Sequence, residues 1–221
     1  MRFEVITLFP EVIEAYARVS IVGRAWREGL IEICTHQLRN HGIGNYRQVD
    51  DRPYGGGTGQ ILKPEPIFAA QRIIPKLGKN KTILFTPRGV KLSQRILRED
   101  LAAQDQLILI CGHYEGYDER ITTLADHCLS LGNFVLTGGE LGALVVIDAV
   151  TRLQEGVFSK GDAVHQEDSF SDEEANKLEA PQYTRPAEFE GMKVPKVLLS
   201  GNHQEIQAWR EAQSKARPLD V

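Results

Sequence analysis

Short apolar segments, separated by stretches with helical patterns, constrain the fold of this chain more than any other feature of its sequence. They are Phe3–Leu8, Thr82–Phe85, Leu107–Cys111 and Phe134–Leu136. Strands that alternate with helices favour a parallel sheet with helices on both faces. We therefore expect an α/β domain over residues 1–158.

Helical patterns fill the intervals between these segments and follow the last one. They run over Glu11–Val19, Ile21–Glu28, Pro64–Ile74, Ser93–Ala103 and Glu140–Leu153. Ser20 and Ser93 stand where N-caps are expected, and Gly29 stands where the second helix should end. The alternation of the two patterns supports the same fold class.

The sequence changes character after the α/β domain. Residues 159–172 are small and charged and have no strand pattern, which predicts a flexible interdomain linker. Further on, the segment Tyr183–Pro186 is irregular, and Asn202 with Glu205 three residues later resembles a helical capping box. We expect residues 173–221 to form a small, mainly helical domain that begins with a short acidic helix.

Positive and negative residues are unevenly distributed along the chain. Residues 1–98 carry 16 Lys and Arg against 8 Asp and Glu, whereas residues 99–221 carry 10 against 22, which together give the net charge of −4. Such asymmetry is typical of a nucleic-acid-binding surface beside an acidic remainder, although chance segregation on a solvated surface gives the same counts.

Several classes of protein are excluded. No stretch approaches the roughly 18 to 20 apolar residues of a membrane span, and acidic residues interrupt the start of the chain, where a signal peptide is apolar. The three cysteines, Cys34, Cys111 and Cys128, are odd in number and widely spaced, which favours reduced thiols in a cytoplasmic protein. No spacing of Cys and His suits zinc.

The loop Asp50–Gly59 holds four glycines in five consecutive positions. It lacks the Gly-Lys-Ser/Thr of a P-loop, and it does not join a first strand to a first helix as a dinucleotide-binding turn does. With Arg52, Tyr54 and the bare backbone amides of Gly57 and Gly59, it suits a phosphate or a nucleotide base. A plain exposed turn is the alternative.

Further segments with Gly or Pro follow predicted strands. They are Thr86–Gly89, Cys111–Arg120 and Leu131–Leu141. Because open α/β sheets place ligands at the carboxyl ends of their strands, these segments are expected to converge on one flat ligand. Backbone groups would read its edges, and Tyr114, Phe134 and Leu136 would cover its faces. This predicts a purine-containing cofactor bound mostly by main chain.

Charged residues near the end of the α/β domain have two interpretations each. Arg152 closes the last helical pattern, where a cation is favoured by the helix dipole alone. Glu167–Phe170 lies in the linker and by default is an exposed acidic segment. A mobile segment between two domains can, however, close over a bound substrate and bring a carboxylate to it.

The motifs together resemble a known family. In order, they are DDRPYGGGTG, CGHYEGYDER, LGNFVLTGGEL, EDSFSD, YTRP and VPKVLLSGNHQEIQAWR. They resemble the bacterial tRNA (guanine-N1-)-methyltransferases, which belong to the SPOUT, or trefoil-knotted, methyltransferase superfamily. The resemblance extends from about residue 1 to about residue 213, with family-like spacing.

This resemblance implies a parallel α/β sheet with a deep trefoil knot, S-adenosyl-L-methionine bound among the knot loops, and a homodimer with active sites at the subunit interface. The cofactor-binding residues that it implies are Pro87, Gly112, Tyr114, Glu115, Gly116, Leu131, Gly132, Asn133, Phe134, Val135, Leu136, Gly138 and Gly139. Glu115 could also hold a divalent ion such as Mg²⁺, and a helix-capping or interface carboxylate is the alternative.

The resemblance also implies the catalytic residues, with Asp168 as general base and Arg152 as its electrophilic partner. N1 of guanine is a poor nucleophile while it carries its proton, and removal of the proton spreads negative charge toward O6. A carboxylate at N1 and a cation near O6 meet both demands.

The implied substrate is tRNA, at the guanosine immediately 3′ of the anticodon, position 37, whose methylation maintains the reading frame. Substrate contacts are expected from Arg52, Tyr54, Gly57, Gly59 and Ser169, and phosphate contacts from the basic first half, including a cluster over 76–98. The competing interpretations are a knotted RNA methyltransferase that acts on a ribose 2′-hydroxyl and an RNA-binding factor without catalysis.

Overall fold

The structure is a computed structural model that describes residues 1–158, 169–170 and 178–214. The chain divides into two compact units, Met1–Ser159 and Lys160–Val221. Most of the expected linker, the acidic stretch that follows it and the C-terminal residues 215–221 lie outside the described residues.

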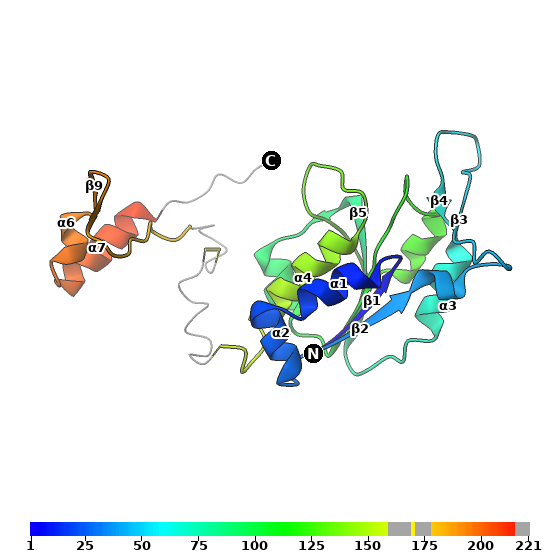
Figure 1. Cartoon of the computed structure of the whole chain (residues 1–221), viewed down its shortest axis with the longest axis horizontal. Coiled ribbons are helices and arrows are strands. Elements are labelled where there is room, and N and C mark those ends of the chain that lie inside the picture. Colours follow the sequence, from blue (N-terminus) through cyan, green and yellow to red (C-terminus); the bar gives the residue numbers. More distant parts are fainter. Residues whose placement is uncertain (159–168, 171–177, 215–221) are drawn as a thin grey trace. The chain divides into compact units, whose positions relative to one another are not determined.

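The first unit is built on a five-stranded sheet in the order β2-β1-β6-β5-β7, and all of its neighbouring strands pair in parallel (Figure 1). The strands are β1 (Arg2–Thr7), β2 (Glu32–Gln37), β5 (Asn80–Lys91), β6 (Gln106–Ile110) and β7 (His127–Ser130). The predicted parallel sheet is confirmed, and three of the four predicted strands lie in β1, β5 and β6.

The fourth predicted strand, Phe134–Leu136, is wrong. These residues lie in a loop between β7 and the following helix, and Val135 is 84% exposed. The segment is apolar because it lines a cavity, as described below, and not because it is buried in the sheet. Within this sheet, the strands that the sequence missed are β2 and β7, which are its two edges. Edge strands are partly exposed, so their polar sequences lack a continuous apolar run.

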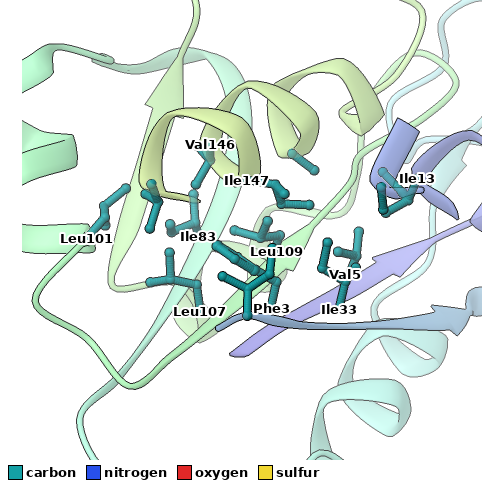
Figure 2. Packing of buried hydrophobic residues seen from close by; sticks show 14 of the residues in the cluster. Phe3, Val5, Ile13, Ile33, Ile83, Leu101, Leu107, Leu109, Val146 and Ile147 are labelled. Carbon is teal, nitrogen blue, oxygen red and sulfur yellow. The ribbon is translucent and has the colours of Figure 1, made fainter. Parts of the chain in front are cut away.

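Side chains on one face of the sheet pack against α1 (Pro10–Ala17), α2 (Ser20–Arg27) and α4 (Glu140–Arg152). Figure 2 shows Phe3 and Leu109 from the strands packed near Ile147 of α4. All three are fully buried. Their cluster has 21 buried residues against 12 on the opposite face, so it is the larger part of the core.

The opposite face of the sheet packs against α3 (Pro64–Arg72) and two short 3₁₀ helices, η1 (Leu38–His41) and η3 (Glu119–Leu124). Ile6 and Ile108 contribute to this second cluster. Because successive residues of a strand point to opposite faces, each central strand supplies both clusters. Helices therefore cover both faces of the sheet.

The structure shows which residues cap the helices predicted to begin at Ser20 and Ser93. Ser20 is not the N-cap of α2, since Val19 occupies that position and no side chain caps the helix. Ser20 is instead the first helical residue and has a φ of 54°. Ser93 does accept a hydrogen bond from the backbone N–H of Ile96 at 3.3 Å, at the start of the π-helix η2 (Ile96–Leu101).

A short antiparallel pair, β3 (Asp50–Asp51) and β4 (Ile61–Leu62), brackets the glycine-rich loop. The pair holds the two ends of the loop beside each other, so residues 52–60 project from a fixed base.

The second unit contains a hairpin and two helices. They are β8 (Glu188–Phe189), β9 (Met192–Lys193), α6 (Lys196–Leu199) and α7 (His203–Gln213). The predicted cap is confirmed, because the Asn202 side chain accepts hydrogen bonds from the backbone N–H groups of Gln204 and Glu205 at 3.1 and 3.4 Å. The hairpin was not predicted.

Candidate active site

A cavity of about 440 Å³ lies where β5, β6 and β7 lead into loops at their carboxyl ends. Its walls are Ile61, Phe85–Arg88, Gly112–Tyr117, Leu129–Leu131, Phe134–Gly139 and Gly142. The volume falls within the roughly 300 to 1,000 Å³ of small-molecule sites in proteins. The three loop segments that the sequence singled out therefore do converge on one space.

The first wall comes from an interruption in β5. Leu129 of β7 pairs with both Phe85 and Val90, so the residues between them loop out of the sheet. Gly89 allows the loop to return, because a Cβ there would lie 2.5 Å from the Cys128 carbonyl. Pro87, a predicted cofactor residue, is held in this loop at the cavity.

The second wall follows β6 and is tied to the glycine-rich loop. The backbone N–H of Glu115 donates to the Gln60 carbonyl at 3.0 Å, and that of Leu62 donates to the Gly116 carbonyl at 2.9 Å. A Cβ on Gly59 would lie 2.4 Å from Cγ of Glu115. The predicted substrate loop and the predicted cofactor loop are therefore in direct contact.

The third wall lies between β7 and α4 and approaches the second one through its backbone. The N–H of Gly139 donates to the Gly112 carbonyl at 2.8 Å. A Cβ on Gly139 would lie 2.8 Å from Cα of Cys111, so only glycine permits this approach. All predicted cofactor residues except Gly132 and Asn133 line the cavity.

His113 lies inside the predicted segment Cys111–Arg120 without a role of its own there, and it also lines the cavity. Its Nδ1 accepts a hydrogen bond from the backbone N–H of Tyr114 at 3.0 Å, so a neutral His113 carries its proton on Nε2. Its ring lies 5.0 Å from the ring of Phe9, between centroids. In the sequence, only its position between Gly112 and Tyr114 indicates a place in the site.

Three arginines lie in the cavity lining or close to the segments that form it. Arg88 lines the cavity and forms an ion pair with Glu119, and Arg39 lies 3.4 Å from the Tyr114 hydroxyl. Arg120 makes two hydrogen bonds of 2.7 Å with Asp118, and these lower the pKa of that carboxyl. This end of the molecule is suited to phosphate groups.

Not every predicted basic residue lies at this end. Lys76 and Lys79 precede the amino end of β5, whereas Arg88 lies in the loop at the cavity. The basic cluster over 76–98 is therefore divided between the two ends of the sheet.

Arg152 is distant from the cavity within one chain. It is the last residue of α4, whose first turn adjoins the cavity, and its guanidinium carbon lies 5.6 Å from the centre of the Phe158 ring. At 1.5 Å per residue, the 13 residues of α4 separate Arg152 from Glu140 by about 18 Å. Asp168, the predicted general base, lies outside the described residues.

The remaining predicted substrate residues occupy different places. Arg52, Gly57 and Tyr54 are exposed in the glycine-rich loop. Ser169 belongs to the second unit, where its hydroxyl accepts a hydrogen bond from the backbone N–H of Glu179 at 3.0 Å.

An exposed apolar surface adjoins the cavity, and we term it the α1/α4 face. It comprises Phe9, Val12, Tyr16 and Val19 at and around α1 and Leu141 and Val145 on α4, all between 37% and 53% exposed. The Tyr16 hydroxyl donates to Asp148 of α4 at 2.5 Å, which together with burial raises the pKa of Tyr16 to about 12. Since Phe9 touches His113, the face begins at the cavity wall.

Comparison with known proteins decides the family. The family model described as "tRNA (Guanine-1)-methyltransferase TrmD" matches residues 1–220. The chain belongs to this family.

Relatives in the TrmD family match nearly the whole of this chain. The tRNA (guanine-N(1)-)-methyltransferase of Synechococcus sp. (strain JA-2-3B'a(2-13)) is 51% identical over 218 residues, covering 98% of this chain and 85% of that protein. The enzyme of the same name from Staphylococcus carnosus (strain TM300) is 47% identical, covering 98% and 87%. The crystal structure of tRNA (m1G37) methyltransferase from Aquifex aeolicus matches with a TM-score of 0.77 and 41% identity, covering 95% of this chain and 87% of that one.

Two kinds of feature, a metal-binding cluster and a membrane-spanning helix, are absent from the described part of the chain. No three His, Cys, Asp or Glu side chains there come together as ligands of a metal ion, and Glu115 packs against Gly59. Among the same residues, no helix is both long enough and apolar enough to cross a membrane.

Proposed function

We propose that this TrmD-family chain transfers a methyl group from S-adenosyl-L-methionine to N1 of guanosine 37 in tRNA. The observation that carries the proposal is the cavity, since its backbone-rich walls unite eleven of the thirteen residues that the family resemblance assigns to the methyl donor. Its position beside the glycine-rich loop supplies a place for the guanine.

The cavity suits the proposed cofactor. Phe134 and Leu136 offer apolar faces for a purine, and the segments at Gly112 and Gly138 present backbone groups to its edges. Side chains are excluded where the backbones meet at Gly139. When bound, S-adenosylmethionine supplies the methyl group as a sulfonium electrophile.

The protein's own residues prepare the guanine. Asp168 removes the proton from N1, and Arg152 stabilises the negative charge that develops at O6. General-base catalysis of this kind contributes about 10² to 10⁴ in rate.

A homodimer accounts for the remote position of Arg152. Apolar surface of the kind found on the α1/α4 face is typical of a protein–protein contact, and it is continuous with the cavity wall. Two copies packed about a two-fold axis through this face, with their α4 helices antiparallel, would bring Arg152 of the partner subunit to the cavity end of α4. The active site is then completed by the second copy.

Family membership also supports the finer architecture. We assign a deep trefoil knot to the carboxyl-terminal part of residues 1–158, a linker to 159–172 and a tRNA-binding domain to 173–221. The basic residues around the cavity would hold phosphates of the anticodon stem-loop, and the reaction would take place in the cytoplasm. We assign Mg²⁺ no step in the reaction.

Methyl transfer to tRNA transcripts tests the proposal. The full chain is incubated with labelled S-adenosylmethionine and transcripts that carry guanosine or adenosine at position 37, each with and without guanosine at position 36, and the product nucleosides are separated. We expect 1-methylguanosine only from the transcripts that carry G37, and the yield should be highest when G36 precedes it. A ribose-methylated product, or no product from a chain that binds tRNA, would overturn the proposal in favour of the competing interpretations.

A further inference from the structure

One buried carboxylate beside the cavity has no part in the mechanism above. Glu140 is the first residue of α4 and is 6% exposed. Its Oε1 accepts a hydrogen bond of 2.7 Å from the hydroxyl of Thr7, which is fully buried at the end of β1. The Thr7 hydroxyl in turn accepts from the backbone N–H of Phe9 at 2.9 Å. The carboxylate is therefore held in one position.

That position is directly behind the cavity wall. A Cβ on Gly138 would lie 2.3 Å from Oε2 of Glu140, and Gly138 itself lines the cavity. Gly139 and Gly142, on either side of Glu140 in sequence, line it as well. These three residues have no side chains, so the carboxylate is separated from the cavity by backbone and by the ring of His113, whose Nε2 would lie 3.0 Å from the same Cβ on Gly138.

The charge of Glu140 is not needed to hold the fold together at this point. A glutamine would accept the same hydrogen bond from Thr7 through its amide oxygen and would avoid the cost of burying an ionised group. Within residues 1–158, 169–170 and 178–214, no lysine, arginine or histidine forms an ion pair with Glu140. Its charge is offset in part by the N-terminus of α4 and remains available to a cation in the cavity.

A second buried group lies close to Glu140. The thiol of Cys111 lies under the same wall, and burial, with a further contribution from the Glu140 carboxylate, raises its pKa well above the usual value. Cys111 therefore stays neutral, and its thiol adds no second negative charge next to Glu140.

The proposed cofactor and its product differ in charge at one atom. S-Adenosylmethionine carries a sulfonium cation, whereas S-adenosylhomocysteine carries a neutral thioether. A fixed negative charge in a water-poor site favours the cation over the neutral form of nearly the same shape.

We propose that Glu140 is a specificity-determining residue that acts through space, making the cavity prefer the cationic methyl donor over the neutral demethylated product. The inference rests on the proposed function and adds that, once the methyl group has left, the attraction to Glu140 is lost and product release is favoured.

Binding measurements on the Glu140→Gln variant of the full chain test this inference. Calorimetry gives dissociation constants for S-adenosylmethionine, S-adenosylhomocysteine and an unreactive analogue with an ammonium group in place of the sulfonium. We expect the affinity for both cations to fall about tenfold and that for S-adenosylhomocysteine to change less than twofold. Tenfold equals about 1.4 kcal/mol, the interaction of opposite unit charges about 12 Å apart at an effective dielectric constant of about 20.

Thr7→Val is the matched control, since it removes the hydrogen bond and keeps the charge. It should weaken all three ligands by similar factors. Equal losses for the three ligands in Glu140→Gln, or a shift in preference in Thr7→Val as large as in Glu140→Gln, would overturn the inference. If Glu140→Gln does not fold, the Glu140→Asp variant replaces it. This variant keeps the charge and should retain the preference for the cations. Loss of that preference in Glu140→Asp would also refute the role of charge. A wild-type chain that binds none of the ligands would contradict the proposed function instead.

Discussion

Gly139→Ala places a methyl group where two backbones meet, and its effect follows from distances in the structure. The new Cβ would lie 2.8 Å from Cα of Cys111 and 2.9 Å from the backbone nitrogen of Gly112. Since carbon atoms pack at about 3.5 to 4.0 Å, the third wall must move outward by roughly 1 Å. That movement lengthens the 2.8 Å hydrogen bond from Gly139 to Gly112 and displaces two segments of the cavity wall.

Overpacking of this kind costs about 1 to 3 kcal/mol of folding free energy. For a domain of this size, each kcal/mol lowers the melting temperature by about 2 to 4 °C. We therefore expect a melting temperature lower by at least about 2 °C and an affinity for S-adenosylmethionine at least tenfold weaker. Differential scanning fluorimetry and calorimetric titration measure the two quantities.

Gly112→Ala is the matched control, because it adds the same methyl group to the same cavity. There the nearest atom is Cδ1 of the Tyr117 ring at 3.3 Å, and a side chain yields more readily than backbone. We expect a loss of stability no more than half as large. Wild-type stability and cofactor affinity in Gly139→Ala, or larger losses in Gly112→Ala, would refute the argument that backbone contact shapes this cavity.

Four further predictions test the assembled site. Asp168→Ala should abolish methyl transfer and leave cofactor binding almost intact, and lost binding with an unchanged single-turnover rate would contradict its role as base. Arg152→Ala should slow the chemical step by about 10² to 10⁴, whereas a wild-type rate would leave Arg152 a helix-end cation. Val145→Asp should give monomers in analytical ultracentrifugation, while Ile73→Asp, at an exposed site outside the α1/α4 face, should not; dimers in both variants would exclude that face. Arg88→Gln should weaken tRNA binding and reduce the slope of log affinity against log salt by about 0.9, and Lys79→Gln, at the other end of the sheet, should do neither.

Sequence reasoning found the centre of the sheet and missed its edges, for a physical reason. Central parallel strands such as β6 are buried on both faces, and every residue of β6 except Gln106 is apolar. The edge strand β7 has the sequence HCLS, and two of its four residues are only partly buried. An apolar run such as Phe134–Leu136 predicts a strand, because sequence alone cannot distinguish burial in a sheet from exposure toward a ligand.

The sequence predicted the backbone segments that form the site better than it predicted the roles of the charged side chains. Glycines at Gly112, Gly138 and Gly139 stand out in sequence, and their role follows from where strands end. The function of a single charged residue depends on distances that no local pattern records. Arg152 lies at the far end of a helix from the cavity, and Glu140 is buried behind its wall. Only the fold shows that Arg152 is remote from the cavity of its own chain and that Glu140 faces the cavity through glycine.

The contact between the backbones at Gly139 and Gly112 also bears on inhibition. A compound that occupies the cavity through hydrogen bonds to these main-chain groups would touch few atoms that a mutation can replace. Substitution at Gly139 adds a side chain where the next backbone leaves no space, so a resistant variant would sacrifice the cavity on which its own activity depends. Resistance would then have to arise at the cavity's side chains, such as Phe134 and Leu136, which marks them as the contacts that a durable inhibitor should avoid.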